Sequence, residues 1–569
     1  MVHTTALLKA KSKIENGTVK QPLPDRQVIR SRLRLILRGA AVFLIILLVT
    51  LSLQWGSGAH SAAFGAEPDE ASHYVTGVMV HDYIARGLPG NPVTFAKDFY
   101  IHYPRVAFGL WPPLFHLSSG VWMLAFGTSR TSILFLLVAF TTAWAFIFYL
   151  ISRRALGTIG AAVGAVLLVL LPTTQKNTAT VMLEIPLAVM MLLAIAAYAR
   201  YLERERIADA LVFGVFAAAA LLVKYNALAL ALVPPLSVIL TGKHYLWRSK
   251  SFWLPVPVVL VIAGPWYVAM RHLGMYAAEL GSRTPTLMAL LAGNARNMIV
   301  VAGPVVFVLA VFGSVLMRLN LRRQSEDSNS LYVVAAAMIL AVFIFHCLTH
   351  RVYLRYFLPA APALMLLSRP SLEYLHSFLR KRTAVTLLAL SLLVGVHVAA
   401  TFGVPLKQTR AYIKAADAVM SSGLPHNGAV LVSADAEGEG MLTAEFVMRD
   451  RRPDHYVVRG SKLLASQTLM GDKYELKYHT PEQIMMVLDS IPIAIVVAQR
   501  CPKGKCTEHE NLLTEAATLY PERWRLSSVI PSEPDSPILI YQISGNESKA
   551  VQMLQVDMLK TLGTTIDSR

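Results

Sequence analysis

Charged residues are scarce in this chain, and their scarcity excludes a string of soluble domains. Only 15% of the 569 residues are Asp, Glu, Lys or Arg, whereas soluble domains contain about 25%. Hydrophobic residues make up 55%. Apolar runs of about 17–22 residues recur between residues 40 and 402, and runs of that length can span a hydrocarbon core of about 30 Å. The chain is therefore predicted to be a multi-pass membrane protein.

Cysteine is scarcer still, with three residues in the whole chain. Of the three cysteines, Cys347 lies inside an apolar run and is expected to be a packing residue. Cys501 and Cys506 either close a small disulfide loop outside the cytoplasm or form half of a zinc site that lacks a visible second pair of ligands. No cofactor is predicted, and a divalent ion at a catalytic site has no support in the sequence.

Internal repeats and low-complexity tracts are not evident, and the part after residue 403 has neither a Gly-rich phosphate loop nor a nucleophile elbow. Basic residues are abundant, with a net charge of +18. Most of them lie in short clusters between apolar runs, as in the cytoplasmic loops of membrane proteins. The charge is therefore not interpreted as a nucleic-acid site, and no nucleic-acid partner is predicted.

Eleven apolar runs are long enough to span a membrane. They lie near residues 40–57, 131–151, 156–172, 181–201, 208–223, 225–241, 252–271, 297–317, 331–348, 353–368 and 384–402. A twelfth run, Pro113–Gly127, is short and aromatic and is expected to lie at the interface. With this count and a cytoplasmic N-terminus, every strong basic cluster falls on the inside. The basic segment Arg26–Arg38 precedes a full span rather than a cleavable signal peptide, and the predicted location is the inner (plasma) membrane.

The same count predicts mainly α architecture with three parts. These are a cytoplasmic tail over residues 1–35, a transmembrane domain over 36–403 with a long first outer loop at 58–130, and an extracytoplasmic soluble α/β domain over 404–569. In the last part, Ala429–Ser433 and Ile493–Val497 are typical of buried strands. Helical periodicity is present at 407–422, 438–449 and 481–489.

The first outer loop begins with acidic residues that have two interpretations. Pro68 is typical of the first turn of a helix, and Asp69 and Glu70 suit the positive end of the helix dipole. Alternatively, one of the two carboxylates acts as a general base on an acceptor hydroxyl or amine. Glu184 lies at the outer end of the fourth run, and an ionisable group inside a span by default indicates function.

Basic residues on the predicted outer face run against the positive-inside pattern. They are Lys176, Lys224, Arg271, Arg283, Arg296, His350, Arg351 and Arg355. Either they extend to lipid headgroups, or they hold an anionic ligand such as a lipid phosphate. Acids that deprotonate an acceptor and cations that hold a phosphate leaving group favour glycosyl transfer from a lipid-phosphate sugar. The same residues would also suit a transporter of an anionic substrate.

Five short features follow one another along the chain in a characteristic order. They are Pro68-Asp69-Glu70, Trp111-Pro-Pro-Leu-Phe-His116, Glu184-Ile-Pro-Leu, Lys224 and Leu354-Arg355-Tyr356-Phe-Leu-Pro359. Through these features, over roughly residues 35–400, the chain resembles the GT-C membrane glycosyltransferases that include the dolichyl-phosphate-mannose–protein mannosyltransferases and the bacterial lipid A aminoarabinose transferase. The resemblance implies a GT-C fold, a polyprenyl-phosphate sugar as donor, and a lipid, glycan or protein as acceptor.

The resemblance also implies roles for individual residues. Asp69 would be the catalytic base, supported by Glu70, and Glu184 would be a second active-site acid. Lys224, Arg355 and Tyr356 would bind the donor phosphate.

Two positions depart from the family pattern. Trp111 stands where the family has Lys, so that one donor contact is either lost or supplied by Arg105. Glu184 stands where the family usually has Asp, which makes the side chain about one methylene longer.

The predicted reaction is an inverting transfer at the outer face of the membrane, by a hexosyl- or pentosyltransferase. One alternative is an oligosaccharyltransferase-like protein, although the C-terminal part has no Trp-Trp-Asp motif. Another is a transporter or a non-catalytic binder of lipid-linked anionic substrates. Transporters commonly have repeated halves with polar residues near mid-membrane, whereas the polar residues here gather at the outer ends of spans and in one long loop.

Overall fold

The computed structural model describes residues 26–271, 285–320, 329–378, 383–467, 473–501, 506–532, 536–558 and 564–567. The predicted outer cation Arg283, most of the predicted N-terminal tail and the basic residues 322–323 and 380–382 lie outside the described residues. The chain divides into two compact units, Met1–Ile45 and Ile46–Arg569. In the first unit the described part is the beginning of helix α2 (Arg26–Gly56); everything below concerns the second unit.

Helices make up most of the first four hundred residues of the structure. Those that build the first outer loop are η1 (Ala59–Ser61), α3 (Glu70–Ala85), α4 (Pro92–His102) and α5 (Leu114–Phe126). They are followed by α6 (Arg130–Leu170), α7 (Pro172–Thr178), α8 (Glu184–Arg204), α9 (Ile207–Val223), η2 (Tyr225–Leu232), α10 (Val233–Thr241), η3 (His244–Arg248), α11 (Lys250–Trp253), α12 (Pro255–Ile262) and α13 (Gly264–Ala269). The later helices are α15 (Leu287–Ala302), α16 (Pro304–Asn320), α17 (Asn329–Leu348), η5 (Leu354–Ala360), α18 (Ala361–Leu367), α19 (Arg369–Phe378) and α20 (Thr383–Thr401).

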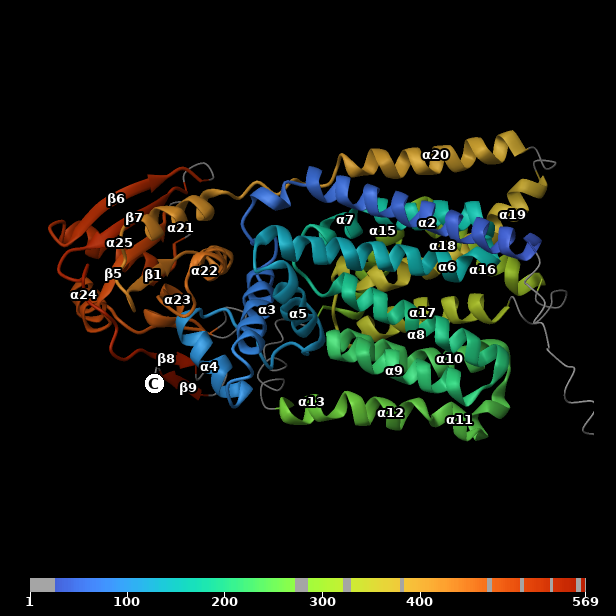
Figure 1. Cartoon of the computed structure of the whole chain (residues 1–569), viewed down its shortest axis with the longest axis horizontal. Helices are drawn as coiled ribbons and strands as arrows, with labels where there is room; N and C mark the ends of the chain where they lie inside the picture. The colour runs from blue at the N-terminus through green and yellow to red at the C-terminus, as the bar shows by residue number, and fades with distance from the viewer. Residues whose placement is uncertain are drawn as a thin grey trace, which may run out of the picture. The chain divides into compact units, whose positions relative to one another are not determined.

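Apolar helices pack side by side in this part of the molecule. Helix α8 contacts α6, α9 and α17, and α17 also contacts α10 and α18 (Figure 1). Helix α8 has most of its length buried among its neighbours. This helix carries Glu184 at its first position, so the packing places that acid at one end of the bundle core.

Four helical segments of the described chain are long and apolar enough to cross a membrane. They are Leu33–Gly56, Arg130–Leu170, Glu184–Arg204 and Ser330–Leu348. A fifth would be counted if the bent pair α15 and α16 forms one span. Helices therefore occur at the predicted runs, and the chain is a multi-pass membrane protein, while the count of eleven spans stays a prediction.

The predicted continuous span at 297–317 is wrong in one respect, because the structure divides it. Helices α15 and α16 meet at an angle of 104°. Gly303 has a φ of +83° at the break, and Pro304 follows as the first residue of α16. A left-handed glycine ends one helix and proline cannot donate the backbone hydrogen bond that would continue it.

A five-stranded sheet with flanking helices follows α20. Its strands are β1 (Ala429–Ser433), β2 (Tyr456–Arg459), β5 (Ile493–Gln499), β6 (Trp524–Ile530) and β7 (Ile538–Ile543). The helices of this part are α21 (Ala411–Ser421), α22 (Ala436–Arg449), α23 (Gly460–Leu463), α24 (Pro481–Ser490) and α25 (Glu508–Leu519). Two short strand pairs complete it, β3 (Ala465–Ser466) with β4 (Glu475–Leu476) and β8 (Gln555–Met558) with β9 (Thr564–Asp567).

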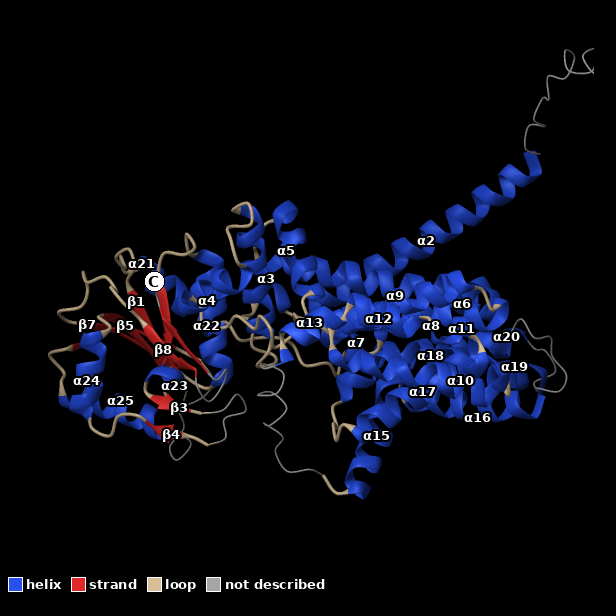
Figure 2. Ribbon diagram, turned by 90° about the horizontal axis from the view of Figure 1, so that it is seen from below, coloured by secondary structure: helices blue, strands red, loops and turns tan. Residues whose placement is uncertain are grey.

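The strand order is β2-β1-β5-β7-β6. Strands β2, β1 and β5 run parallel, and β5, β7 and β6 run antiparallel. Figure 2 shows the strands gathered together with α21, α22, α24 and α25 around them. Both segments predicted as buried strands, Ala429–Ser433 and Ile493–Val497, are strands, because their continuous apolar sequences are covered on both faces.

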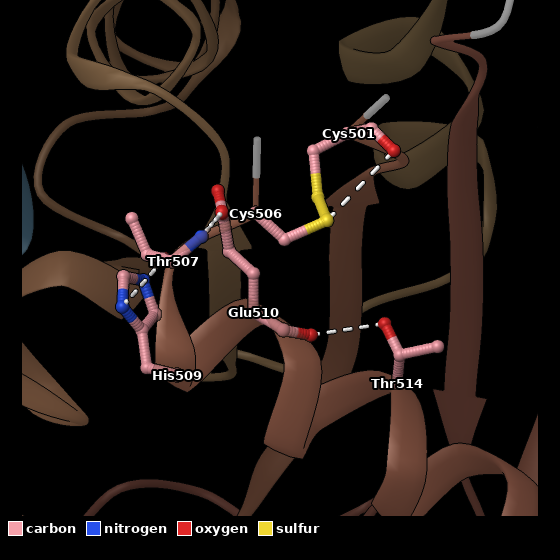
Figure 3. The surroundings of a disulfide bond; sticks show 6 residues. All are labelled: Cys501, Cys506, Thr507, His509, Glu510 and Thr514. Atoms are coloured by element: carbon pink, nitrogen blue, oxygen red, sulfur yellow. Dashed lines mark hydrogen bonds between the residues drawn. A yellow bond between two sulfur atoms is a disulfide. The ribbon is translucent and has the colours of Figure 1, made fainter. Parts of the chain in front are cut away.

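A disulfide joins Cys501 and Cys506, whose Cα atoms are 5.3 Å apart, just before the capped start of α25 (Figure 3). Of the two interpretations of this cysteine pair, the structure has the disulfide. Cys347 is a free cysteine.

Candidate active site

Asp69 stands immediately before helix α3, at the position where a short polar side chain normally caps the helix. Its side chain makes no capping hydrogen bond. Within the described part of the chain, the Asp69 carboxylate has neither a hydrogen-bond nor an ion-pair partner. Burial raises the pKa of this carboxyl, and Lys224 and Arg355 oppose that rise. The geometry thus leaves Asp69 free to accept a proton from a ligand, instead of serving as a helix cap.

Glu70, by contrast, is fully buried and fully engaged. One of its oxygens accepts from the backbone N–H of Ala66 at 2.9 Å. The other accepts from the N–H of Val181 at 3.1 Å and from Lys407 Nζ at 2.6 Å. Neighbouring acids therefore have different environments: Glu70 ties three segments together, and Asp69 is held beside them with its carboxylate open.

Glu184 and Lys224 form a buried ion pair. Lys224 Nζ lies 2.6 Å from Glu184 Oε1, with side chains 2% and 1% exposed. Helix α9 ends at Lys224, which adopts an extended backbone before η2 begins. The second oxygen, Glu184 Oε2, is buried and has no hydrogen-bond partner among the described residues. A buried carboxylate oxygen left in this state is costly, and a ligand or water would satisfy it.

Arg355 connects this pair to a third acid, Glu67. Arg355 Nη1 lies 2.5 Å from Glu67 Oε2, and Arg355 Nε lies 3.3 Å from Glu184 Oε1. Glu67 Oε1 in turn accepts from Lys176 Nζ at 2.8 Å. The result is one network of alternating charges that extends from the start of α8 to the residues just before Asp69.

Aromatic rings cover the ammonium group of Lys224. Its Nζ lies 4.7 Å from the ring centre of Tyr356 and 5.6 Å from that of Trp111. Such contacts stabilise a cation by about 0.5–2 kcal/mol. Trp111, which replaces a lysine of the family pattern, thus contributes a ring face beside Lys224 rather than a second positive charge.

Arg105 lies at the junction with the C-terminal part. Its guanidinium donates to the backbone oxygen of Ala436. Burial and the neighbouring Arg459 lower the pKa of Arg105 to about 9, and Asp69 is among the groups that oppose this decrease. Arg105 therefore interacts electrostatically with Asp69, but its guanidinium hydrogen bond is to α22 and not to the Glu184–Lys224 pair.

A cavity of about 310 Å³ adjoins the network on the side of Arg355. Side chains from α7, Glu67 and Arg355 line it together with the backbone segment 403–405 that follows α20. A cavity with charged groups at its wall and apolar residues elsewhere is the usual form of a small-molecule site.

Sequence reasoning missed three groups that contact these residues. Glu67 bridges two predicted cations, and Lys407 binds Glu70. His73 and His116 form a buried pair, with His73 Nδ1 3.2 Å from His116 Nε2. Only His73 had a usable signal, since it follows Asp69 by one helical turn. Burial lowers the pKa of both imidazoles, that of His116 to about 4, so this pair is neutral.

Not every predicted outer cation joins the network. In the ranges that the structure describes, Arg271, Arg296, His350 and Arg351 make no hydrogen bond or ion pair with Asp69, Glu70, Glu184, Lys224 or Arg355. Spacing along the sequence could not distinguish the cations that join the network from those that do not. It predicts that all of them lie on the outer face, but it does not predict where each helix end lies around the bundle.

One group of residues away from this network has the donor atoms of a metal site. Oxygen and nitrogen atoms of Asp450, Asp454 and His455 lie within 4.8 Å of one another. Asp450 already accepts from Tyr103 and from both the backbone N–H and Nδ1 of His455. The group therefore forms a hydrogen-bonded junction between α4 and β2, and its donors are in use.

Known proteins are similar to this chain in two ways: a family model matches part of its sequence, and solved structures share its fold. The family model of dolichyl-phosphate-mannose-protein mannosyltransferase matches residues 111–268, which include Trp111, Glu184 and Lys224. A search of curated protein sequences gave no match.

Solved structures match much more of the chain. The apo structure of ArnT from Cupriavidus metallidurans has a TM-score of 0.56 at 13% identity, covering 91% of this chain and 99% of that one. The same protein bound to undecaprenyl phosphate gives a TM-score of 0.55 at 13% identity, covering 89% and 99%. The archaeal oligosaccharyltransferase AglB from Archaeoglobus fulgidus, in complex with an inhibitory peptide and a dolichol-phosphate, gives 0.50 at 11% identity, covering 89% and 74%. The chain therefore has the GT-C fold, and its predicted resemblance to the protein mannosyltransferases and the aminoarabinose transferase is confirmed.

Proposed function

We propose that this protein is a membrane glycosyltransferase that transfers a sugar from a polyprenyl-phosphate donor to a lipid, glycan or protein acceptor. The observation that carries the proposal is the open Asp69 carboxylate within the field of two cations, the buried Lys224 and the partly buried Arg355. A base beside cations suits a reaction in which a proton is removed at one point and negative charge develops at another. The ligands bound in the similar structures, undecaprenyl phosphate and dolichol-phosphate, support the donor class.

The proposed reaction is a single displacement. Asp69 takes the proton of an acceptor hydroxyl or amine, and the acceptor atom forms a bond to the anomeric carbon. The bond from that carbon to the phosphate oxygen breaks, and both electrons leave with the lipid phosphate. The configuration at the anomeric carbon is inverted, because the acceptor enters opposite the leaving group.

Lys224 and Arg355 stabilise the leaving phosphate in this proposal. In the structure both are paired with acids, Glu184 and Glu67. A phosphate that approaches them enters a site where the cations are already oriented, and oriented charges stabilise a transition state without reorganisation at the moment of reaction. The ring of Tyr356 packs against the ammonium group of Lys224. Glu184 orients the two cations, and Glu70 fixes the turn that carries Asp69.

We further propose that the site faces the outside of the inner (plasma) membrane, with the N-terminus in the cytoplasm. Lys407 of the C-terminal part binds Glu70 of the first outer loop, so both lie on the same side. The Cys501–Cys506 disulfide supports an oxidising compartment for that side. The division into a transmembrane domain over 36–403 and an extracytoplasmic domain over 404–569 stays part of this proposal.

Purified protein incubated with a panel of polyprenyl-phosphate sugars tests the function. Release of polyprenyl phosphate together with sugar transfer from at least one donor is expected. Asp69→Asn should abolish transfer, because the amide cannot take the proton, and should leave the protein folded. The exposed residue of the same loop, Asp98, supplies the matched control, since Asp98→Asn should transfer at the wild-type rate. Undiminished turnover by Asp69→Asn would remove Asp69 from its role, and donor binding without turnover by the wild type would favour a non-catalytic binder.

A further inference from the structure

The segment that leads from α20 to the C-terminal sheet runs directly along the start of the first outer loop. We call residues 403–410 the connecting segment. The backbone N–H of Lys407 donates to Ser57 O at 2.8 Å, and the N–H of Ala63 donates to Thr409 O at 2.8 Å. Arg410 adds a side-chain hydrogen bond to Ser61 Oγ at 3.0 Å. The connecting segment is thus bound at three points to the residues that precede Asp69.

One side chain of the connecting segment reaches the candidate active site. Lys407 Nζ lies 2.6 Å from Glu70 Oε1, with side chains 11% and 0% exposed. The same ammonium group donates to the backbone oxygen of Ala179 at 3.3 Å and faces the ring of Phe64 at 5.8 Å. Lys407 is the cation that compensates the buried charge of Glu70.

The other end of the connecting segment touches the cavity. Gly403, Val404 and Pro405 line its wall together with Glu67 and Arg355. The connecting segment therefore contacts Glu70, the acid beside Asp69, and also forms part of the cavity wall next to Arg355. A shift of this segment would move the base and the phosphate-binding cation relative to each other.

We propose that Lys407 is a positioning residue for the reaction, which fixes Asp69 through Glu70. The inference rests on the proposed function for its kinetic part. Without Lys407, the Glu70 carboxylate would be a buried charge with no cation, a state that strongly destabilises its surroundings. Glu70 would then protonate or turn away, and the turn that carries Asp69 would lose its anchor. Misplacement of a catalytic group by about 1 Å costs on the order of 100-fold in rate.

The kinetic test compares two variants of Lys407 and one control variant with the wild type. Lys407→Met should lower kcat by about 10- to 100-fold with KM for the lipid donor nearly unchanged, because Lys407 does not contact the donor. Lys407→Arg, which keeps the charge, should recover most of the lost rate. The exposed Lys414, seven residues further on, gives the matched control, and Lys414→Met should behave as wild type.

Gly58→Ala moves the connecting segment without removing either charge. A Cβ at Gly58 would overlap the backbone oxygen of Lys407, and the φ of +78° at Gly58 disfavours any side chain. The expected result is again a lower kcat at unchanged KM. A wild-type kcat in both Lys407→Met and Gly58→Ala would overturn the inference, and so would a loss in Lys407→Met that appears in KM alone.

A stability cycle decides the inference independently of any transfer. Thermal unfolding of wild type, Lys407→Met, Glu70→Gln and the double variant in detergent measures the coupling between the two side chains. The double variant should be less destabilised than the sum of the single ones, because neither charge is then left alone. Additive shifts would overturn the inference even if the wild type proved inactive with every donor. If Asp69→Asn abolishes transfer while Lys407→Met and Gly58→Ala both keep the wild-type kcat, the proposed function stands and the inference fails.

Discussion

Two regions of the molecule bury several charged groups: the network around Asp69, and the junction between the predicted first outer loop and the C-terminal part. They differ in whether these groups have hydrogen-bond and ion-pair partners. At the junction, the carboxylate of Asp82 in α3 accepts from Arg452 of the C-terminal part, from Nε at 2.9 Å and from Nη2 at 3.2 Å. In the network, the Asp69 carboxylate has no partner in the described ranges, and Glu184 Oε2 is buried without one.

This difference distinguishes two uses of buried charge. A network in which every group has its partners fixes two segments against each other and gains little from a further ligand. A network with open atoms in a buried setting is less stable than it would be with a ligand in place. The comparison therefore supports the proposed binding role of the region of Asp69 and Glu184, and it indicates that the region of Asp82 serves attachment.

The largest effect should come from removing the cation at the centre of the open network. Lys224→Met removes the nearer of the two cations that contact buried Glu184, which keeps only the 3.3 Å contact with Arg355 Nε, and it removes a charge from the proposed leaving-group site. We expect a loss of about 100- to 1,000-fold in kcat and of about 3–5 kcal/mol in stability.

The double variant Glu184→Gln with Lys224→Met is the control for that change. It should regain part of the stability, because no lone buried charge remains, but not the activity. Recovery of both would mean that Lys224 serves only the ion pair, and the distinction between the two regions would lose its basis. The measurements are steady-state transfer rates and thermal unfolding.

A second effect concerns pH. Burial raises the pKa of Asp69 above its ordinary value of about 4. A base works only when ionised, so activity is complete above the raised pKa and is lost as pH falls through it. Arg355 opposes the rise, and Arg355→Gln should move the acid limb of the kcat/KM profile to still higher pH. An acid limb of the kcat/KM profile that lies below the ordinary aspartate pKa would contradict the role of Asp69 as the base. An acid limb that Arg355→Gln does not move would contradict it as well.

The smallest effect on activity is expected at the completed junction. Arg452 binds Asp82 through Nε at 2.9 Å and Nη2 at 3.2 Å, joining the C-terminal part to α3. Arg452→Met should lower stability by about 1.5–3 kcal/mol, the usual contribution of charged hydrogen bonds, and leave kcat per folded molecule within about twofold. A large fall in kcat without loss of stability would show that this junction, too, takes part in the reaction.

Much of the candidate site was predictable because local sequence carries it. Pro68-Asp69-Glu70 begins a helix as expected, and Lys224, isolated among apolar residues, is brought together with Arg355 at the same acid, Glu184. An isolated charged residue in an apolar run can be recognised from the sequence alone. Burying its charge without a partner is so unfavourable that the folded protein must supply one. The two continuous apolar segments that became β1 and β5 were predictable for a similar reason.

Partnerships between distant segments were not predictable. Lys407 is one of several basic residues near the end of the last apolar run, and nothing in its neighbours indicates that it meets Glu70, 337 positions earlier. The bend at Gly303 was hidden within a continuous apolar run, since hydropathy is insensitive to a local change of helix direction.

By itself, the sequence determined that the chain is helical and crosses a membrane several times, and which acids and cations are candidates for chemistry. These properties depend on hydropathy and on the cost of burying charge, both of which act on each residue where it stands. Only the tertiary structure decided which of the two acids is open: Glu70 is occupied by Lys407 and two backbone N–H groups, and Asp69 is not. That division depends on the backbone direction at a single helix start and on a side chain from the far end of the fold, so no local pattern could reveal it.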